Sequence, residues 1–271
     1  MVTSGLVVLA ACAVASLVRA TPGPRAAIPR EPEALARTLV ETKSELGSAV
    51  DDWLASRDPR PSSDVTLDVL YDQRIELLLA ANPRLARATL RLVSAAIARQ
   101  VQTNLAAKRE LWRLTPLTHR RRFRTGPALP PATLRRYYGE AQRRFGVRWN
   151  LLAAVNFVES AFNKLRNNSA TGAQGPMQFM PATWRAYGLG GNVRDPHDAV
   201  LGAANYLHAN GSPRDNRRAL FQYNPSPLYV DAVLRYAREI RNDRRAFYEY
   251  YARQVFVRTP FGLRRITGPG R

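Results

Sequence analysis

Residues 159–184, ESAFNKLRNNSATGAQGPMQFMPATW, carry more chemical information than any other part of the chain. They begin with Glu159 at the end of the segment LLAAVNFV, which predicts a helix over 150–159 that is apolar almost all round and therefore buried on most sides. Burial disfavours a charged carboxylate, so we expect Glu159 to keep its proton toward neutral pH, as a general acid must. The alternative is a glutamate that simply reaches solvent from a helix end.

The residues after Glu159 favour a sugar as the ligand. Residues 167–175 form a polar, glycine-bearing loop, residues 176–181 follow it, and a new helix is predicted from Ala182. Backbone groups and the amide of Gln178 suit hydroxyl and N-acetyl groups, while aromatic rings stack on pyranose faces. A buried acid beside such a loop indicates chemistry on a glycan.

The same residues resemble a known family. Glu159-Ser160 followed by GAQGPMQFMPATW at 172–184 is similar to the signature of the soluble lytic transglycosylase-like (SLT) domain. Further blocks at 195–207, 219–224 and 229–230 resemble later elements of that domain, in the same order. Pro176 departs from the leucine usual there and removes one backbone N–H, so no donor to substrate is assumed at that position.

The resemblance implies a mainly α, lysozyme-like catalytic domain that cleaves the β-1,4 bond between N-acetylmuramic acid and N-acetylglucosamine. It implies these roles by position: Glu159 as the catalytic acid/base, Ser160 orienting it, Met177, Gln178 and Phe179 lining the glycan site, Tyr223 near the scissile bond, and Asn224 supporting that loop. For Tyr223 and Asn224 a purely structural role, as a core contact and a cap at a helix end, is the alternative.

A second catalytic carboxylate is not evident in this region. Most glycosidases use two, yet no Asp or Glu lies between Glu159 and Asp195, and Asp195 and Asp198 are placed to cap a helix. One acid suffices if the muramyl C6 hydroxyl is the nucleophile, which gives a 1,6-anhydro end. Muramidase hydrolysis of the same bond and a non-catalytic glycan-binding module are the alternatives.

The charge points to anionic partners. The net charge is +20 over 271 residues, which attracts polyanions. The basic residues are spread along the chain, with one cluster at 120–124, and no zinc finger or aromatic RNA motif appears, so we expect no nucleic acid. Peptidoglycan strands are the predicted partner, with anionic wall polymers or a membrane surface as further candidates. The three histidines are scattered and Cys12 is the single cysteine, so we expect neither a metal nor a cofactor.

The N-terminus indicates export. Residues 5–18, GLVVLAACAVASLV, form an apolar run shorter than the about 20 residues of a membrane-spanning helix. Residues 1–20 are interpreted as a signal peptide with a cleavage site at 18–20, or as an uncleaved anchor, although Met1–Ser4 carries no positive side chain. Cys12 in LAAC also resembles a lipoprotein processing site. An extracytoplasmic, wall-associated location follows.

The remaining chain divides into helical segments. We predict a helical N-terminal region over 33–114, a basic Pro-rich linker over 115–131, the catalytic domain over 132–245 and a C-terminal extension over 246–271. Further expectations are a continuous helix over 85–114, N-terminal acids on solvated faces, a helix over 133–145 ended by Gly146, and a strand over 254–259 packed on the catalytic domain.

Overall fold

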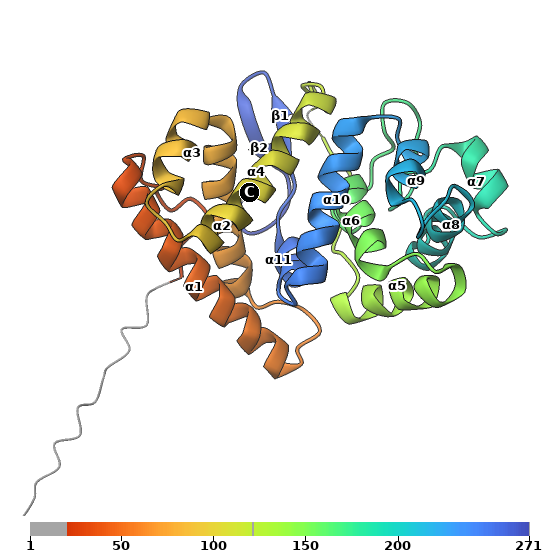
Figure 1. Ribbon diagram of the computed structural model, residues 1–271, viewed down its shortest axis with the longest axis horizontal. Coiled ribbons are helices and arrows are strands. Elements are labelled where there is room, and N and C mark those ends of the chain that lie inside the picture. The colour runs from red at the N-terminus through yellow and green to blue at the C-terminus, as the bar shows by residue number, and fades with distance from the viewer. Residues whose placement is uncertain (1–20, 121, 271) are drawn as a thin grey trace, which may run out of the picture.

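The computed structural model describes residues 21–120 and 122–270, and helices dominate them (Figure 1). The helices are α1 (Pro32–Ser56), α2 (Ser63–Ala81), α3 (Pro83–Leu90), α4 (Ala95–Leu114), α5 (Pro131–Phe145), α6 (Trp149–Ser160), α7 (Pro181–Tyr187), α8 (Pro196–Ala209), α9 (Asn216–Tyr223), α10 (Pro227–Asn242) and α11 (Ala246–Ala252). One antiparallel hairpin, β1 (Phe256–Thr259) and β2 (Gly262–Arg265), pairs Phe256 with Arg265. The predicted mainly α class is confirmed.

Helices α1 to α4 enclose a hydrophobic core of their own. Leu35 and Leu39 of α1 meet Ile75 and Leu79 of α2 and Val101 of α4 there. Buried positions recur at three-to-four spacing in α1 and α4, so each of these helices turns one stripe inward, whereas α2 is buried on most sides. The second, larger core begins at the other end of α1 and continues through the helices that follow Pro131.

The prediction of one helix over 85–114 is wrong. The chain leaves α3 after Leu90 and enters α4 at Ala95, where the Ser94 hydroxyl accepts a hydrogen bond from the Ile97 amide at 3.4 Å. A serine cap starts a new helix by satisfying an amide that would otherwise lack a partner. Hydrophobic spacing alone does not reveal this break, because the apolar positions continue at helical spacing after it.

The expectation that N-terminal acids lie on solvated faces is also wrong for two of them. Asp72 and Glu76 on α2 are buried, and Lys43 of α1 reaches both, at 2.9 Å and 3.2 Å. Arg253, which follows α11, lies 2.6 Å from Glu76. A buried charge requires such partners, and here they join the start of the chain to its end.

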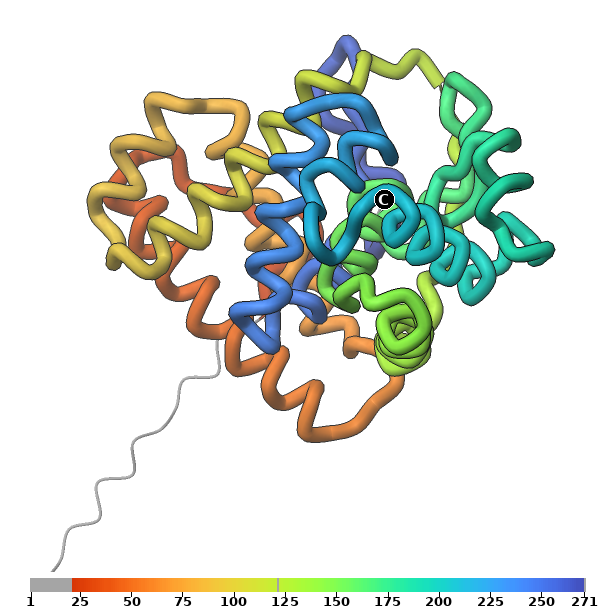
Figure 2. The backbone as a smooth tube through the Cα atoms, turned by 45° about the vertical axis from the view of Figure 1, so that its right-hand side comes forward, coloured from red at the N-terminus to blue at the C-terminus, as the bar shows by residue number. Residues whose placement is uncertain are grey.

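Helix α10 stands at the centre of the molecule. It packs on α4 along one side and on α6 along the other, as both views of the chain display (Figures 1 and 2). The SLT-like region folds around α6, with α5 against α8 and α6, and α9 against α8 and α10. Gly146 ends α5 in the left-handed conformation, φ 72°, as predicted.

The C-terminal extension is built into the core. Phe247, Tyr250 and Tyr251 of α11 are buried, and Lys164 donates from its ammonium group to the carbonyls of Tyr251 and Arg253. These contacts attach α11 to the chain segment that follows α6.

The predicted strand forms at β1, but its hydrogen bonds to distant parts of the chain go to the region after α4. The Arg258 carbonyl accepts from the Thr118 amide, the Arg258 guanidinium donates to the Trp112 and Thr115 carbonyls, and Arg264 donates to the Arg120 carbonyl. The hairpin therefore bonds to the end of α4 and to the chain after it, rather than to the helices of the predicted catalytic domain.

The predictions for residues 1–20, including Cys12, lie outside the described residues. Across residues 21–120 and 122–270, no helix has both the length and the apolar character needed to span a membrane.

Candidate active site

Glu159 lies in the last turn of α6, a helix that is buried along most of its length. Leu151 to Val155 of the same helix are buried, and Glu159 itself is half-buried. Burial raises the pKa of the Glu159 carboxyl to about 7, against the effect of one hydrogen bond that lowers it. The carboxyl therefore exchanges its proton near neutral pH, which is the condition for acting as both acid and base.

The hydrogen bond to Glu159 comes from Tyr229 in the first turn of α10. The Tyr229 hydroxyl donates to Oε1 of Glu159 at 2.6 Å. Burial, and then the neighbouring Glu159 charge, hold the pKa of the Tyr229 phenol well above its usual value, so the phenol stays a donor. In the sequence, Tyr229 belongs to the block at 229–230 that resembles the family, but no role could be given to it because its partner lies 70 residues away along the chain.

Ser160 holds the loop after α6 and not the acid. Its hydroxyl donates to the Pro176 carbonyl at 2.6 Å and accepts from the Asn163 amide at 2.8 Å. The Asn156 amide group donates to the same Pro176 carbonyl at 2.9 Å, and Tyr138 donates to Asn156 at 2.6 Å. The expected orientation of Glu159 by Ser160 is corrected: this buried network fixes Pro176 beside the end of α6.

A tight hairpin turn carries Gln178. The amides and carbonyls of Gln174 and Phe179 exchange two hydrogen bonds of 2.8 Å. Gly175 has φ +74°, and a Cβ there would lie 1.8 Å from the Val193 carbonyl oxygen, so only glycine fits. Gln178 also has positive φ, and its amide nitrogen donates to the Gly175 carbonyl at 2.8 Å. The half-buried Gln178 thus has its side chain held in place by its own turn.

Met177 and Phe179 do not present their side chains at the surface. They are 0% and 3% exposed, so the expectation that they line the glycan site with their side chains is corrected. The reason is alternation: in the turn, Met177 and Phe179 point into the core while Gln178 between them points out. Their contribution is to anchor the turn.

Tyr223 and Asn224 end α9 beside this turn. The Tyr223 hydroxyl donates to the Met177 carbonyl at 2.6 Å, and burial followed by the Glu159 charge raises the pKa of its phenol well above the usual value. The Asn224 amide donates to the Leu220 carbonyl and its own carbonyl accepts from the Ser226 amide at 2.7 Å. Tyr223 is near the acid, while the contacts of Asn224 are those of a helix-end cap.

Partly exposed rings beside the turn were not identified from the sequence as a group. Phe179 meets Trp184 at 5.2 Å between ring centroids and Tyr223 at 5.8 Å, while Tyr206 lies 5.5 Å from Tyr223 and 4.8 Å from Tyr187. Edge-to-face packing of this kind keeps aromatic rings in fixed orientations. Their positions in the sequence show no common spacing, because they come from α7, α8 and α9.

The carboxylates elsewhere in this region have structural partners. Asp195 accepts from the amides of His197 and Asp198, at 2.9 Å and 3.1 Å, as the predicted cap of α8. Among the described residues these three also form a group close enough to hold a metal ion, but Asp198 accepts from the Asn192 amide and His197 contacts Glu140 at 2.9 Å. Hydrogen bonds within the protein account for the cluster.

Comparison with known proteins agrees with this geometry. Residues 136–244 match the family model of the transglycosylase SLT domain. The chain is also similar to a membrane-bound lytic murein transglycosylase F of Thiobacillus denitrificans, with 36% identity over 74 residues, which are 27% of this chain and 15% of that protein. The chain thus matches less than a fifth of the length of that relative, and no solved structure matches it. Glu159, the turn that holds Gln178, Tyr223 and Tyr229 all fall inside residues 136–244, the part of the chain that is similar to the transglycosylase SLT domain.

Proposed function

We propose that this chain is a peptidoglycan lytic transglycosylase that cleaves the bond between N-acetylmuramic acid and N-acetylglucosamine and leaves a 1,6-anhydromuramyl end. The SLT domain and the similarity to a lytic murein transglycosylase support the reaction class. The finer assignment depends on the surroundings of Glu159.

The observation that carries the proposal is the isolation of the Glu159 carboxyl. Burial and the Tyr229 hydrogen bond account for its pKa, and within the described residues no carboxylate or cation adds to them. A hydrolase with two carboxylates holds them about 5–5.5 Å or about 6.5–9.5 Å apart. With one acid near pKa 7, the same group has to give and then take the proton.

The proposed reaction needs no second protein carboxylate. Protonated Glu159 gives its proton to the oxygen between the two sugars as the bond from that oxygen to the muramyl C1 breaks. The Glu159 carboxylate then removes the proton of the muramyl C6 hydroxyl while O6 bonds to C1. Glu159 ends protonated again, and one N-acetylglucosamine end and one anhydro end result without water.

Tyr229 selects the oxygen of Glu159 that reacts. Its hydroxyl occupies Oε1 at 2.6 Å, which leaves Oε2 to carry the proton. The same bond stabilises the carboxylate between the two steps, since a hydrogen bond to the charged form favours that form. Tyr229 is therefore proposed as a positioning residue for Glu159.

Glycan binding is assigned to the turn and the rings beside it. The Gln178 side chain is half-buried and held by the Gly175 carbonyl. Trp184, Tyr187 and Tyr206 are each partly exposed, and such rings suit the faces of pyranose sugars. We place the sugar contacts on these groups, with Met177 and Phe179 fixing the turn from below.

The flanking segments are proposed to brace a catalytic domain over 132–245. Helix α10 of that domain packs on α4, and Lys164 is bonded to carbonyls of the C-terminal extension. We also infer that the chain acts outside the cytoplasm, on the basis of the apolar run at 5–18 and of the relative named as membrane-bound.

Product analysis tests the proposal. The full chain and its Glu159→Gln variant are incubated with peptidoglycan sacculi, and the released muropeptides are weighed by mass spectrometry. Muramyl ends lighter by one water than reducing ends, absent with the variant, are the expected result. Reducing ends instead would indicate a muramidase hydrolase, and sacculus binding without release would indicate a glycan-binding module.

A further inference from the structure

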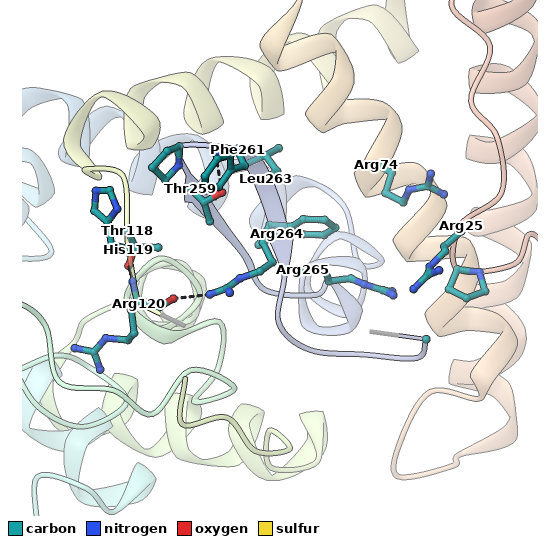
Figure 3. Close-up of a pocket in the computed structure, with 14 residues that line it drawn as sticks. Arg25, Arg74, Thr118, His119, Arg120, Thr259, Phe261, Leu263, Arg264 and Arg265 are labelled. Atoms are coloured by element: carbon teal, nitrogen blue, oxygen red, sulfur yellow. Dashed lines mark hydrogen bonds between the residues drawn. The ribbon is translucent and has the colours of Figure 1, made fainter. Parts of the chain in front are cut away.

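A pocket of about 760 Å³ lies away from Glu159, between the segment at Pro24, helix α2, residues 118–120 and the β1–β2 hairpin (Figure 3). None of the residues described above around the acid lines it. Its walls come from the beginning, the middle and the end of the chain, so only the folded protein forms it.

The pocket is strongly basic. Arg25, Arg74, Arg120, Arg264 and Arg265 line it, and among the described residues no carboxylate does. Burial, followed by the positive charges of Arg74 and Arg25, lowers the pKa of the Arg265 guanidinium below its usual value. Like charges held this close repel one another, and an anion between them would remove the repulsion.

Two donors in the pocket wall are buried without a partner. They are Nη1 of Arg265 and Nε of Arg264. Folding leaves buried donors without an acceptor only at a free-energy cost of about 1–3 kcal/mol each. Two of the guanidinium groups that line the cavity thus each keep one unsatisfied buried donor, which favours an acceptor beside them.

Other contacts fix the arginines before any ligand arrives. Arg74 donates to the Ala26 carbonyl at 2.8 Å, and Arg264 donates to the Arg120 carbonyl. Figure 3 shows the side chains of Arg25 and Arg265 pointing toward each other, with Arg74 on the same side of the pocket. The side chains of Arg25, Arg74 and Arg265 thus gather on one side of the pocket, while Arg264 points the other way, toward Arg120.

The chemistry of the cluster favours a phosphate group. A guanidinium presents paired N–H donors that match two phosphate oxygens, and several such groups suit the charge of a phosphate better than that of a single carboxylate. The pocket is open and larger than a phosphate, so a group that is part of something larger can enter.

An apolar residue at the rim favours a lipid surface as the source of that phosphate. Phe261 at the tip of the hairpin lines the same pocket and is 99% exposed. An aromatic ring beside arginines is the combination found where proteins meet a bilayer interface, with the ring at headgroup depth and the cations on the phosphates. We propose that this pocket binds the phosphodiester headgroup of an anionic lipid, with Phe261 entering the bilayer surface.

The test compares two variants of equal charge. In one, Arg25, Arg74 and Arg265 are changed to Gln; in the other, the exposed Arg84, Arg87 and Arg91 at α3 are changed to Gln. Each full chain is sedimented with phosphatidylcholine vesicles with and without phosphatidylglycerol. The quantity compared is the additional binding caused by phosphatidylglycerol. Binding that does not depend on lipid charge is the same in both kinds of vesicle and cancels.

We expect the pocket variant to lose that gain by at least about tenfold relative to the α3 variant, and Phe261→Ala to weaken vesicle binding as well. Equal weakening of both charge variants would overturn the proposal, because overall charge would then explain the binding. Pocket-dependent binding of soluble poly(glycerol phosphate) with unchanged vesicle binding would also overturn it, in favour of a polymer.

A variant with fewer substitutions tests the same pocket without the risk of disturbing the fold. Arg74 holds the Ala26 carbonyl, so its loss could disturb the fold. The double variant Arg25→Gln/Arg265→Gln leaves that bond intact, and Arg84→Gln/Arg87→Gln is its control. If thermal unfolding of the triple variant is altered, the double pair decides the outcome by the same criteria.

Discussion

Glu159 and Glu76 are both surrounded by protein, yet their carboxyl groups are in opposite electrostatic states. Burial raises the pKa of Glu159 to about 7, and a single tyrosine hydroxyl offsets this in part. Burial acts on the pKa of Glu76 in the same direction, but the charges of Arg253 and Lys43 outweigh it. Together with a hydrogen bond from Asn104 at 2.8 Å, they lower this pKa to about 2.

The difference separates the carboxyl that we propose as the acid from one with a structural role. A carboxylate with two cations and an amide around it has no reason to accept a proton at neutral pH. The Glu159 carboxyl, with one neutral donor, exchanges its proton near pH 7, because burial makes its charged form less stable than it is in water. Burial without a compensating cation, together with the position of Glu159 beside the Gln178 turn and Tyr229, is what supports the proposal that Glu159 is the acid.

The sharpest test of the comparison is the loss of activity on changing Glu159. Glu159→Gln keeps the size and the hydrogen-bond capacity of the side chain but cannot donate and recover a proton. We expect turnover of sacculi to fall by about a thousandfold, within the range of general acid–base catalysis. The rate of muropeptide release, measured at equal enzyme concentration, checks this.

Retention of more than a tenth of wild-type turnover by Glu159→Gln would contradict the assignment. The unfolding midpoint of the same preparation serves as the control, and we expect it not to decrease. A variant that is inactive and also unfolded at the assay temperature would have to be replaced by Glu159→Asp, which retains the acid but shortens its reach.

Glu76 should respond in the opposite way. Glu76→Gln leaves Arg253 and Lys43 buried with less opposing charge, and breaking one member of a buried ion-pair cluster destabilises a protein by about 3–5 kcal/mol. We therefore expect the free energy of unfolding, measured by urea titration, to fall by about 3 kcal/mol, while activity below the unfolding transition is retained.

Glu41→Gln on α1 is the matched control for Glu76→Gln. Glu41 is exposed, and removing its charge should change the free energy of unfolding by less than about 0.5 kcal/mol. Equal effects of the two changes would mean that the charge cluster between α1, α2 and the C-terminal extension contributes no specific stability.

The sequence predicted the raised pKa of Glu159 but not the buried ion pairs of Glu76, and the reason is physical. Glu159 follows an apolar run, so its surroundings are written in the adjacent residues. The partners of Glu76 lie 33 and 177 residues away along the chain, at Lys43 and Arg253. Spacing on α2 places Glu76 on a face but does not reveal that α11 and the segment after it cover that face.

The same distinction applies within the site. The turn that holds Gln178 was recognisable because Gly175 and its neighbours are local. The resemblance to the family implied that Ser160 orients the acid, yet its hydroxyl donates to the Pro176 carbonyl. The pairing of Tyr229 with Glu159 depends on the packing of α10 against α6, which follows only from the folded structure.

Tyr229→Phe sharpens the account of Glu159. The change removes the hydrogen bond that lowers the Glu159 pKa, so this pKa should rise further. We expect kcat/KM to fall about tenfold and the limb of its pH profile that reports the loss of the Glu159 proton to move to higher pH. A merely structural role for Tyr229 would lower activity without moving that limb.

Tyr236→Phe on the same helix is the control for Tyr229→Phe. The Tyr236 hydroxyl is buried and makes no hydrogen bond, while its ring packs on Phe157 and Tyr250. Losing this hydroxyl should leave the pH profile in place and should not decrease stability, since a buried polar group without a partner is removed. If Tyr236→Phe also moved the pH profile, the shift seen with Tyr229→Phe could not be attributed to loss of the hydrogen bond to Glu159.

The smallest expected effect is the dependence of stability on pH that Glu159 introduces. The ordinary pKa of a glutamate carboxyl is about 4.5, and that of Glu159 in the folded protein is about 7. The folded state therefore binds the proton more tightly, and the stabilising contribution of the protonated group is complete below pH 4.5 and is lost as pH rises through 7. Gln cannot ionise, so the free energy of unfolding of Glu159→Gln should match that of the wild type near pH 4 and exceed it at pH 8.

The size of this difference is small. Because the carboxyl is partly open to solvent, we expect a gain of about 1–2 kcal/mol, less than the full shift implies. Urea unfolding of both proteins at the two pH values measures it, and a variant that is less stable than the wild type at pH 8 would mean that the Glu159 carboxylate is compensated after all, as that of Glu76 is.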